Sequence, residues 1–185
     1  MQALIDYIER FVKLDSKAIQ ELANLVEFKT YRKNQHILEV GQRCTKIWFL
    51  KTGMVRKYQI YDGKEITSWI HTENEMFTSL QSYVQNIPSN EYLQASEKTE
   101  VIGIKKSNSE KLAKFPQFMI FSNALMENEF ANIDKHTKAL NQRNAKEKYE
   151  YLREIAPQII KRAKLGHIAS IIGVTQETLS RIRKG

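Results

Sequence analysis

The chain has 185 residues, of which 42% are hydrophobic and 27% charged, with a formal net charge of +8. This size and composition fit one globular domain or two small ones and exclude a disordered chain or a fibre, while a single cysteine excludes a disulfide framework and a cysteine-rich metal or iron–sulfur site. No apolar stretch reaches the roughly 18 residues that span a bilayer, and the N-terminal segment lacks an apolar signal-peptide core, so we expect a cytoplasmic protein without a membrane partner.

The first quarter of the chain predicts helices and then strands. Apolar residues keep helical spacing through two segments, and Asp15 or Ser16 can cap the second helix. From about Glu27 the apolar period changes to two, and β-branched and aromatic residues become frequent. We therefore expect strands to follow the two helices.

Short strands dominate the next part of the chain. Residues 54–61 and 64–71 flank Asp62-Gly63, a dipeptide that favours the type I′ turn of a β-hairpin. Residues 92–96 and 101–105 predict another strand pair. Several short strands with no helices between them indicate an antiparallel sandwich or roll.

A long helix is predicted after Pro116, a residue suited to a first helical turn. Along it, apolar residues recur every seven positions, with Phe130 between two of them: Met119, Met126, Ile133 and Leu140. A 3.5-residue repeat returns apolar side chains to one partner helix, so we expect homodimerisation through these residues. The alternative is a helix that packs on its own β-domain.

The positive charge is confined to the C-terminal quarter. Residues 1–134 carry 17 Lys+Arg and 17 Asp+Glu, whereas residues 135–185 carry 12 Lys+Arg and 4 Asp+Glu. A neutral body with a basic end suggests a polyanionic partner. A solvated basic surface without such a partner is the alternative, and composition alone does not decide between them.

Residues 165–184, LGHIASIIGVTQETLSRIRK, carry the pattern of a helix-turn-helix. Two helices that cross closely need a small residue where they meet and a residue that tolerates positive φ in the turn, which Ala169 and Gly173 supply. Thr175 can cap the second helix. The shared apolar face is expected to contain Ile168, Ile172, Val174, Leu179 and Ile182.

In such a motif the second helix enters the major groove of DNA, where Gln suits adenine, Glu accepts from cytosine and Arg binds guanine. We therefore expect double-stranded DNA as a partner and no catalytic site. The DNA-contacting residues are predicted to be Thr175, Gln176, Glu177, Ser180, Arg181, Arg183, Lys184 and Lys164, with Lys161 and Arg162 as further phosphate contacts. For Glu177 and Arg181 the alternative is an ion pair within the helix.

The order of β-roll, long helix and helix-turn-helix resembles the cyclic-AMP receptor protein/FNR (Crp/Fnr) family of bacterial transcriptional regulators. The segment 173–183, with its Glu-Thr-x-x-Arg core, is similar to the family's recognition helix. The resemblance implies an α+β fold with a cyclic-nucleotide-binding-like β-roll at 1–115, a dimerisation helix at 116–143 and a helix-turn-helix DNA-binding domain at 144–185. It also implies a homodimeric transcription regulator, with RNA polymerase as a candidate partner.

The chain departs from the family pattern where cyclic AMP binds. Nucleotide-binding members carry Phe-Gly-Glu and, about ten residues later, an Arg-Ser or Arg-Thr that holds the cyclic phosphate. The corresponding stretches here, counted back from Ala95, are 77–79 and 89–91, so that carboxylate and arginine are missing. Phe77, Ser79 and Ser89 remain the candidate ligand-binding residues, but we expect no cofactor and no response to cyclic AMP.

Two further absences narrow the expected function. The cysteine cluster of the family's iron–sulfur oxygen sensors is missing, and residues 158–166 are too few for the family's β-hairpin wing. The four histidines have no metal-ligand spacing, and no nucleophile or phosphate-loop motif supports an enzyme. The competing interpretation is a β-roll module that binds a small molecule or a protein partner and carries an incidental basic tail. The sequence identifies no effector.

Overall fold

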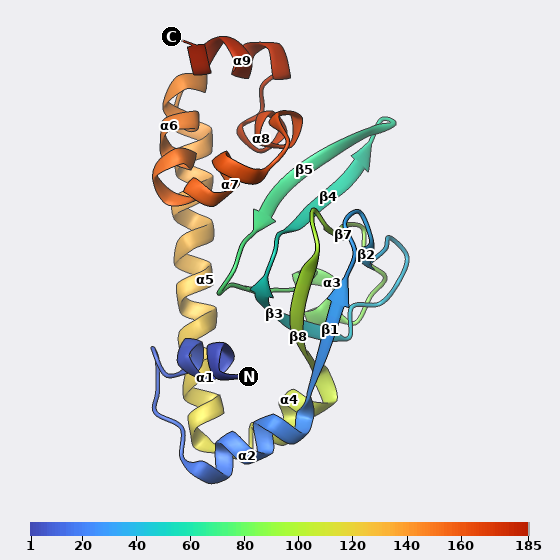
Figure 1. Cartoon of the computed structure of the whole chain (residues 1–185), viewed down its shortest axis with the longest axis vertical. Coiled ribbons are helices and arrows are strands. Elements are labelled where there is room, and N and C mark those ends of the chain that lie inside the picture. Colours follow the sequence, from blue (N-terminus) through green and yellow to red (C-terminus); the bar gives the residue numbers. More distant parts are fainter. Residues whose placement is uncertain (185) are drawn as a thin grey trace.

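The computed structural model describes residues 1–184, so that Gly185, the last residue of the range predicted for DNA binding, lies outside the described part. A long helix, α5 (Pro116–Gln142), runs along a two-sheet body and ends among the C-terminal helices (Figure 1). The helices that precede α5 are α1 (Gln2–Ile8), α2 (Ser16–Leu25), α3 (Leu80–Gln85) and α4 (Lys106–Leu112). Those that follow it are α6 (Ala145–Ile155), α7 (Pro157–Arg162), α8 (Leu165–Ile172) and α9 (Gln176–Lys184).

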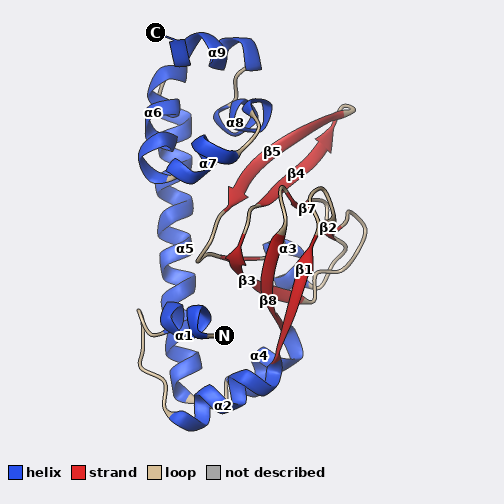
Figure 2. Ribbon diagram, viewed as in Figure 1, coloured by secondary structure: helices blue, strands red, loops and turns tan. Residues whose placement is uncertain are grey.

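Within residues 1–184, eight strands form two antiparallel sheets, with orders β1-β8-β3-β6 and β2-β7-β4-β5. Figure 2 shows the strands, in red, gathered into one body beside α5. Their bounds are β1 (Val26–Tyr31), β2 (His36–Leu38), β3 (Lys46–Thr52), β4 (Val55–Tyr61), β5 (Lys64–His71), β6 (Met76–Phe77), β7 (Tyr92–Ala95) and β8 (Thr99–Lys105). We call this body the roll. The predicted α+β class, with antiparallel sheets and a long helix after Pro116, is confirmed.

The turn that joins β4 to β5 has the geometry that the sequence predicts. Asp62 and Gly63 both have positive φ angles, 49° and 70°, as a type I′ turn requires. The hairpin projects from the roll alongside the C-terminal helices (Figure 1).

The predicted pairing of β7 with β8 is wrong. The two strands are consecutive in the chain but lie in different sheets, β7 beside β2 and β4, and β8 beside β1 and β3. The crossing segment is held by the β3–β4 turn, because the Met54 carbonyl accepts from the Ser96 amide at 2.8 Å and from the Thr99 hydroxyl at 3.2 Å. The short connection between β7 and β8 therefore passes from one sheet to the other and does not form a hairpin.

Local capping explains where the helices begin. Asp15 accepts a hydrogen bond from the Ala18 amide at 2.8 Å and so starts α2. Pro116 occupies the first turn of α5, and Pro157 starts α7 directly after α6. Asn144 and Glu147 form a reciprocal capping box at the start of α6.

Three apolar clusters hold the parts together. One joins α1, α2 and the start of α5 to the roll, and a second fills the roll between its two sheets. The third cluster contains residues of α6 to α9 together with Met54 and Ile70 of the roll, which are 1% and 0% exposed. The C-terminal helices therefore share a core with the β-body, and this shared core positions the basic end of the chain.

Gly53 offers a test of the turn that carries Met54. Its φ is +99°, and a Cβ atom would lie 2.6 Å from Thr99 Oγ1 and 2.7 Å from the Lys98 carbonyl oxygen. We expect Gly53→Ala to lower the free energy of unfolding by about 2–5 kcal/mol, because backbone strain and overpacking add. Urea denaturation measures this loss.

Gly63→Ala is the matched control, since Gly63 also has positive φ but has no atom within 4 Å of the added Cβ. It should cost only the backbone strain, about 1–2 kcal/mol. Equal losses in the two variants would contradict the close approach of the turn at Gly53 to Thr99.

Candidate nucleic-acid interface

The turn between α8 and α9 is built by the two residues that the sequence singles out. Gly173 ends α8 with φ 71° and ψ 38°, and the Val174 amide bonds back to the Ala169 carbonyl at 2.9 Å. Thr175 Oγ1 accepts from the Thr178 amide at 3.2 Å, which caps α9 as predicted. A sharp turn thus places two helices in contact and fixes where the second begins.

The predicted apolar face of this helix pair is largely buried. Three of its members, Ile168, Ile172 and Leu179, are 0–1% exposed, and Ala169, the small residue at the crossing, is 2% exposed. Val174 and Ile182 are half-buried against the same cluster. Because these side chains face inward, the polar positions of α9 are left on its outer face.

The predicted DNA-contacting residues lie on that outer surface. Ser180 is half-buried, and the other seven are exposed: Lys164, Thr175, Gln176, Glu177, Arg181, Arg183 and Lys184. The start of α8 also lies close to the start of α9, since a Cβ atom on Gly166 would lie 3.0 Å from Gln176 Oε1. The structure therefore brings the N-terminal ends of both helices, with Lys164 at one of them, to the same region.

The side chain of Arg181 does not form the alternative ion pair with Glu177 but contacts Thr178 instead. Its Nη2 donates to Thr178 Oγ1 at 3.3 Å, whereas Glu177 is held by its own amide and by Thr175, which lower the pKa of its carboxyl. Both side chains are exposed. The guanidinium and the carboxylate therefore stay separately available at the surface.

Arg162 does not belong to this surface, which corrects its assignment as a phosphate contact. Its two terminal nitrogens donate to both oxygens of Glu73 at 2.8 Å, and one of them also donates to Glu97. Both carboxylates belong to the roll. No sequence signal could reveal them, because they lie 89 and 65 positions away in the chain.

A second polar contact joins α8 to β5. Ser170 Oγ accepts from the Thr67 amide at 2.8 Å and donates to the Thr67 carbonyl at 3.3 Å. The two hydrogen bonds satisfy a backbone amide and carbonyl of β5 at a point where its register with β4 shifts. A side chain of the helix pair thus completes the edge of the sheet.

The apolar face of α5 is only partly as predicted. Met119, Met126, Phe130 and Ile133 are 46–77% exposed, but Leu140 is half-buried against the C-terminal cluster of its own chain. A seven-residue repeat drifts by about 20° per heptad around a straight helix, so that its last member has turned toward α6 to α9. Leu140 therefore lies in an intramolecular contact.

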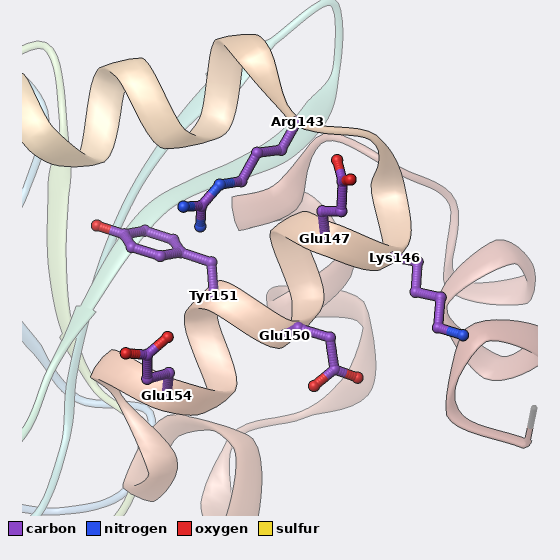
Figure 3. A pocket seen from close by; sticks show the side chains of 6 residues that line it. All are labelled: Arg143, Lys146, Glu147, Glu150, Tyr151 and Glu154. Atoms are coloured by element: carbon purple, nitrogen blue, oxygen red, sulfur yellow. The ribbon is translucent and has the colours of Figure 1, made fainter.

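The surface is hollowed where α5 passes into α6, but its lining is of mixed charge (Figure 3). Arg143 extends over the ring of Tyr151, with 4.6 Å between its Cζ and the ring centroid. The remaining lining residues are Lys146, Glu147, Glu150 and Glu154. Three carboxylates make this hollow unsuited to a phosphate backbone.

The comparisons with known proteins agree on one architecture. Residues 28–114 match the family model of the cyclic nucleotide-binding domain, and no curated protein matches the sequence. FixK2 from Bradyrhizobium japonicum is similar in structure, with a TM-score of 0.72 and 23% identity over 86% of this chain and 83% of that chain. A protein from Eubacterium rectale, described as a putative transcriptional regulator of the crp/fnr family, has a TM-score of 0.68 and 19% identity over 92% of this chain and 82% of that chain. The chain has the Crp/Fnr fold.

One more structure with this fold bears on the question of ligands. The c-di-GMP-responsive global regulator CLP of Xanthomonas campestris has a TM-score of 0.71 and 11% identity, over 92% of this chain and 90% of that chain. At these identities the likeness concerns the Crp/Fnr fold alone. Among the described residues no helix is long and apolar enough to cross a membrane, and no cluster of His, Cys, Asp and Glu could hold a metal ion.

The stretches that correspond to the nucleotide-binding motifs of the Crp/Fnr family meet in the structure, but they bind each other. Ser79 and Ser89 are 1% and 3% exposed, and their hydroxyls lie 3.0 Å apart. Ser89 donates to the Glu91 carbonyl at 2.8 Å, so Ser79 is the donor to Ser89. Phe77 is buried and stacked on Trp48. These residues hold no cation and do not fit a cyclic phosphate.

His167 offers a pH test of the contact between α8 and the roll. Burial, with Arg56 and Lys164 nearby, lowers its pKa from 6.5 to about 4. In this window the unfolded chain binds a proton that the folded chain does not, so stability falls as pH drops from 6.5 toward 4. We expect wild type to lose roughly 1–2 kcal/mol more than His167→Gln between pH 7 and pH 5, measured by urea denaturation.

Glu73 titrates below the pH range of this test and does not affect its result. Arg162 lowers the pKa of its carboxyl from 4.5 to about 2, so its stabilising contribution is present above 4.5 and is lost as pH falls through about 2. If wild type and His167→Gln lost the same stability between pH 7 and pH 5, the lowered pKa of the half-buried His167 would be wrong.

Proposed function

We propose that this protein is a homodimeric, sequence-specific DNA-binding transcription regulator of the Crp/Fnr type. The observation that carries the proposal is the α8–α9 pair, in which Gly173 and Thr175 fix a helix-turn-helix turn and the polar face of α9 stays exposed. In this motif the second helix enters the major groove and its first turns contact base edges. The basic charge of the C-terminal quarter suits the phosphate backbone.

The exposed residues divide by chemistry into base-reading and phosphate-binding groups. Gln176, Glu177 and Arg181 lie on the first turns of α9 and carry side chains that match base edges. Lys164, Arg183 and Lys184 carry exposed cations at the start of α8 and the end of α9, where they would position the protein on phosphates. RNA polymerase remains a candidate partner through which bound protein would act.

The roll supports the regulator without the family's nucleotide contacts. Since Ser79 and Ser89 bond to each other and no cation faces them in this pair, DNA binding would not depend on cyclic AMP. The fold itself does not dictate the effector, because the similar CLP is described as responsive to a different nucleotide. An effector that activates the protein must bind the conformation that binds DNA more tightly than the conformation that does not.

Arg181 and Arg183 provide the test of DNA reading. On the duplex that wild type selects from randomised DNA, Arg181→Ala should lose about 1–3 kcal/mol of binding and relax the preference at one base pair of each half-site. Arg183→Ala should weaken binding to all duplexes alike and reduce the salt slope by about 1, because a phosphate contact carries no sequence information. Site selection followed by fluorescence anisotropy measures both.

The two variants together distinguish this function from a ligand-binding module with an incidental basic tail. Such a module would select no symmetric site, and neither substitution would change its preference. Identical base preferences in Arg181→Ala and wild type would contradict the assignment of α9 as the reading helix.

The exposed face of α5 is the proposed dimer contact. Met119, Met126, Phe130 and Ile133 form an apolar stripe on a helix of 27 residues, and such a stripe is typical of a helix–helix interface. Two copies joined along this stripe would present their α9 helices to successive major grooves about 34–36 Å apart. A near-palindromic site is the expected consequence.

We expect Phe130→Glu to raise the dimer dissociation constant roughly tenfold or more, because a charge would be buried without a partner. Sedimentation equilibrium measures the change. Phe28→Glu on β1 is the matched control, since Phe28 is 61% exposed and Phe130 is 77% exposed. A dimer unaffected by Phe130→Glu, or equally weakened by both changes, would rule out the α5 stripe as the contact.

A further inference from the structure

Arg162, Glu73 and Glu97 form a charged cluster between the C-terminal helices and the roll, called here the Arg162 cluster. Arg162 is the last residue of α7, whereas Glu73 follows β5 and Glu97 lies between β7 and β8. The guanidinium meets Glu73 with two parallel hydrogen bonds of 2.8 Å and also contacts Glu97. A planar bidentate contact fixes direction as well as distance, which a single ion pair does not.

Contacts within the roll also hold these carboxylates in place. Glu73 Oε1 also accepts from the Gly53 amide at 2.9 Å, and the Gly53 turn has no room for a side chain beside Thr99. The segment that carries Glu97 is tied to the same turn through the bond from the Ser96 amide to the Met54 carbonyl. Three connections of the roll therefore converge on one guanidinium.

The cluster is also partly shielded from water. The side chains of Arg162, Glu73 and Glu97 are 27%, 30% and 36% exposed, and the apolar contact of Met54 and Ile70 with the C-terminal helices belongs to the same interface. Partly buried, bidentate pairs stabilise more than freely exposed ones. The contact therefore favours one orientation of the C-terminal helices on the roll.

We propose that Glu73 and Glu97 are positioning residues for DNA recognition: by holding Arg162 they fix the α8–α9 pair on the roll of its own chain. This proposal rests on the proposed function. In a dimer joined through α5, fixing each pair on its roll fixes the separation of the two α9 helices. The docked arrangement is compatible with DNA contact, because Gln176, Glu177 and Arg181 are exposed in it, and we take it as the DNA-competent state.

The first test uses the full-length protein without DNA. The Thr67 amide donates to Ser170 Oγ of α8, so its hydrogen exchange reports whether the helix pair is docked. In Glu73→Gln the amide oxygen can still accept from Gly53, but the charge that holds Arg162 is gone. We expect protection of Thr67 measured by NMR to fall roughly tenfold, in line with loss of a charged hydrogen bond. Arg162→Gln should give the same fall.

Glu100→Gln is the matched control for the exchange test. Glu100 is also a carboxylate of the roll, pairs with Lys51 at 2.9 Å, and changes the net charge by the same amount when substituted. Its protection pattern should equal that of wild type. Unchanged protection of Thr67 in both Glu73→Gln and Arg162→Gln would overturn the proposal whether or not the protein binds DNA.

The second test asks whether docking sets the spacing of the two reading helices. Binding is measured on duplexes in which the selected half-sites are moved apart or together by single base pairs. Wild type and Glu100→Gln should prefer one spacing strongly, whereas Glu73→Gln should bind the optimal spacing roughly tenfold more weakly and the others with little change. A variant that is only less stable would bind duplexes of every spacing more weakly by the same factor.

Two results of the second test would contradict the proposal. Tighter binding by Glu73→Gln would make the docked state inhibitory, and an unchanged spacing preference would remove the positioning role. If wild type bound no duplex, the proposed function would fail, and the exchange result would still decide whether the Arg162 cluster holds the helices on the roll.

Discussion

The interface between the C-terminal helices and the roll is the contact on which the rest of the structure depends. Met54 and Ile70 are fully buried there against Ile168, Ile172 and Leu179. Because these residues belong to one apolar cluster, moving the helix pair away from the roll would expose Met54 and Ile70 to water, which is unfavourable in proportion to the apolar area exposed. The hydrogen bonds of Arg162 and Ser170 to the roll then fix the orientation of the helices, which apolar packing alone does not.

The roll has the fold of a nucleotide-binding domain but lacks the charged side chains that bind the nucleotide in the Crp/Fnr family. Its fold and residues 28–114 are those of a cyclic nucleotide-binding domain, but the stretches that correspond to the family's Phe-Gly-Glu and Arg-Ser or Arg-Thr motifs contribute two serines, Ser79 and Ser89, that bond to each other. Neither hydroxyl carries the positive charge that attracts an anion, and breaking their mutual hydrogen bond would leave the buried Ser79 hydroxyl in need of another partner. The domain therefore serves as a framework for the helices in our account.

The sequence predicted features that depend on neighbouring residues. The type I′ turn at Asp62-Gly63, the positive φ of Gly173 and the cap at Thr175 each follow from the chemistry of two or three adjacent positions. The exposed face of α9 followed from helical periodicity in the same way. These local rules were sufficient to identify the candidate DNA-reading surface.

Features that depend on distant parts of the chain were not predictable. β7 and β8 pair with strands from elsewhere in the chain, and Arg162 pairs with carboxylates far away in sequence. Leu140 fits a seven-residue repeat, yet the rotation of a straight helix brings it to its own C-terminal cluster. In each case the local pattern allowed more than one partner, and packing against distant parts of the chain determined which partner is present.

The central claim, that the chain reads DNA without cyclic AMP, is tested most directly by one binding measurement. Wild-type protein is titrated onto its selected duplex at about 0.15 M salt, with and without cyclic AMP, and the dissociation constant is measured by fluorescence anisotropy. We predict specific binding with the same dissociation constant, within about a factor of two, in both titrations. A specific affinity that arises only with cyclic AMP would contradict the account of Ser79 and Ser89.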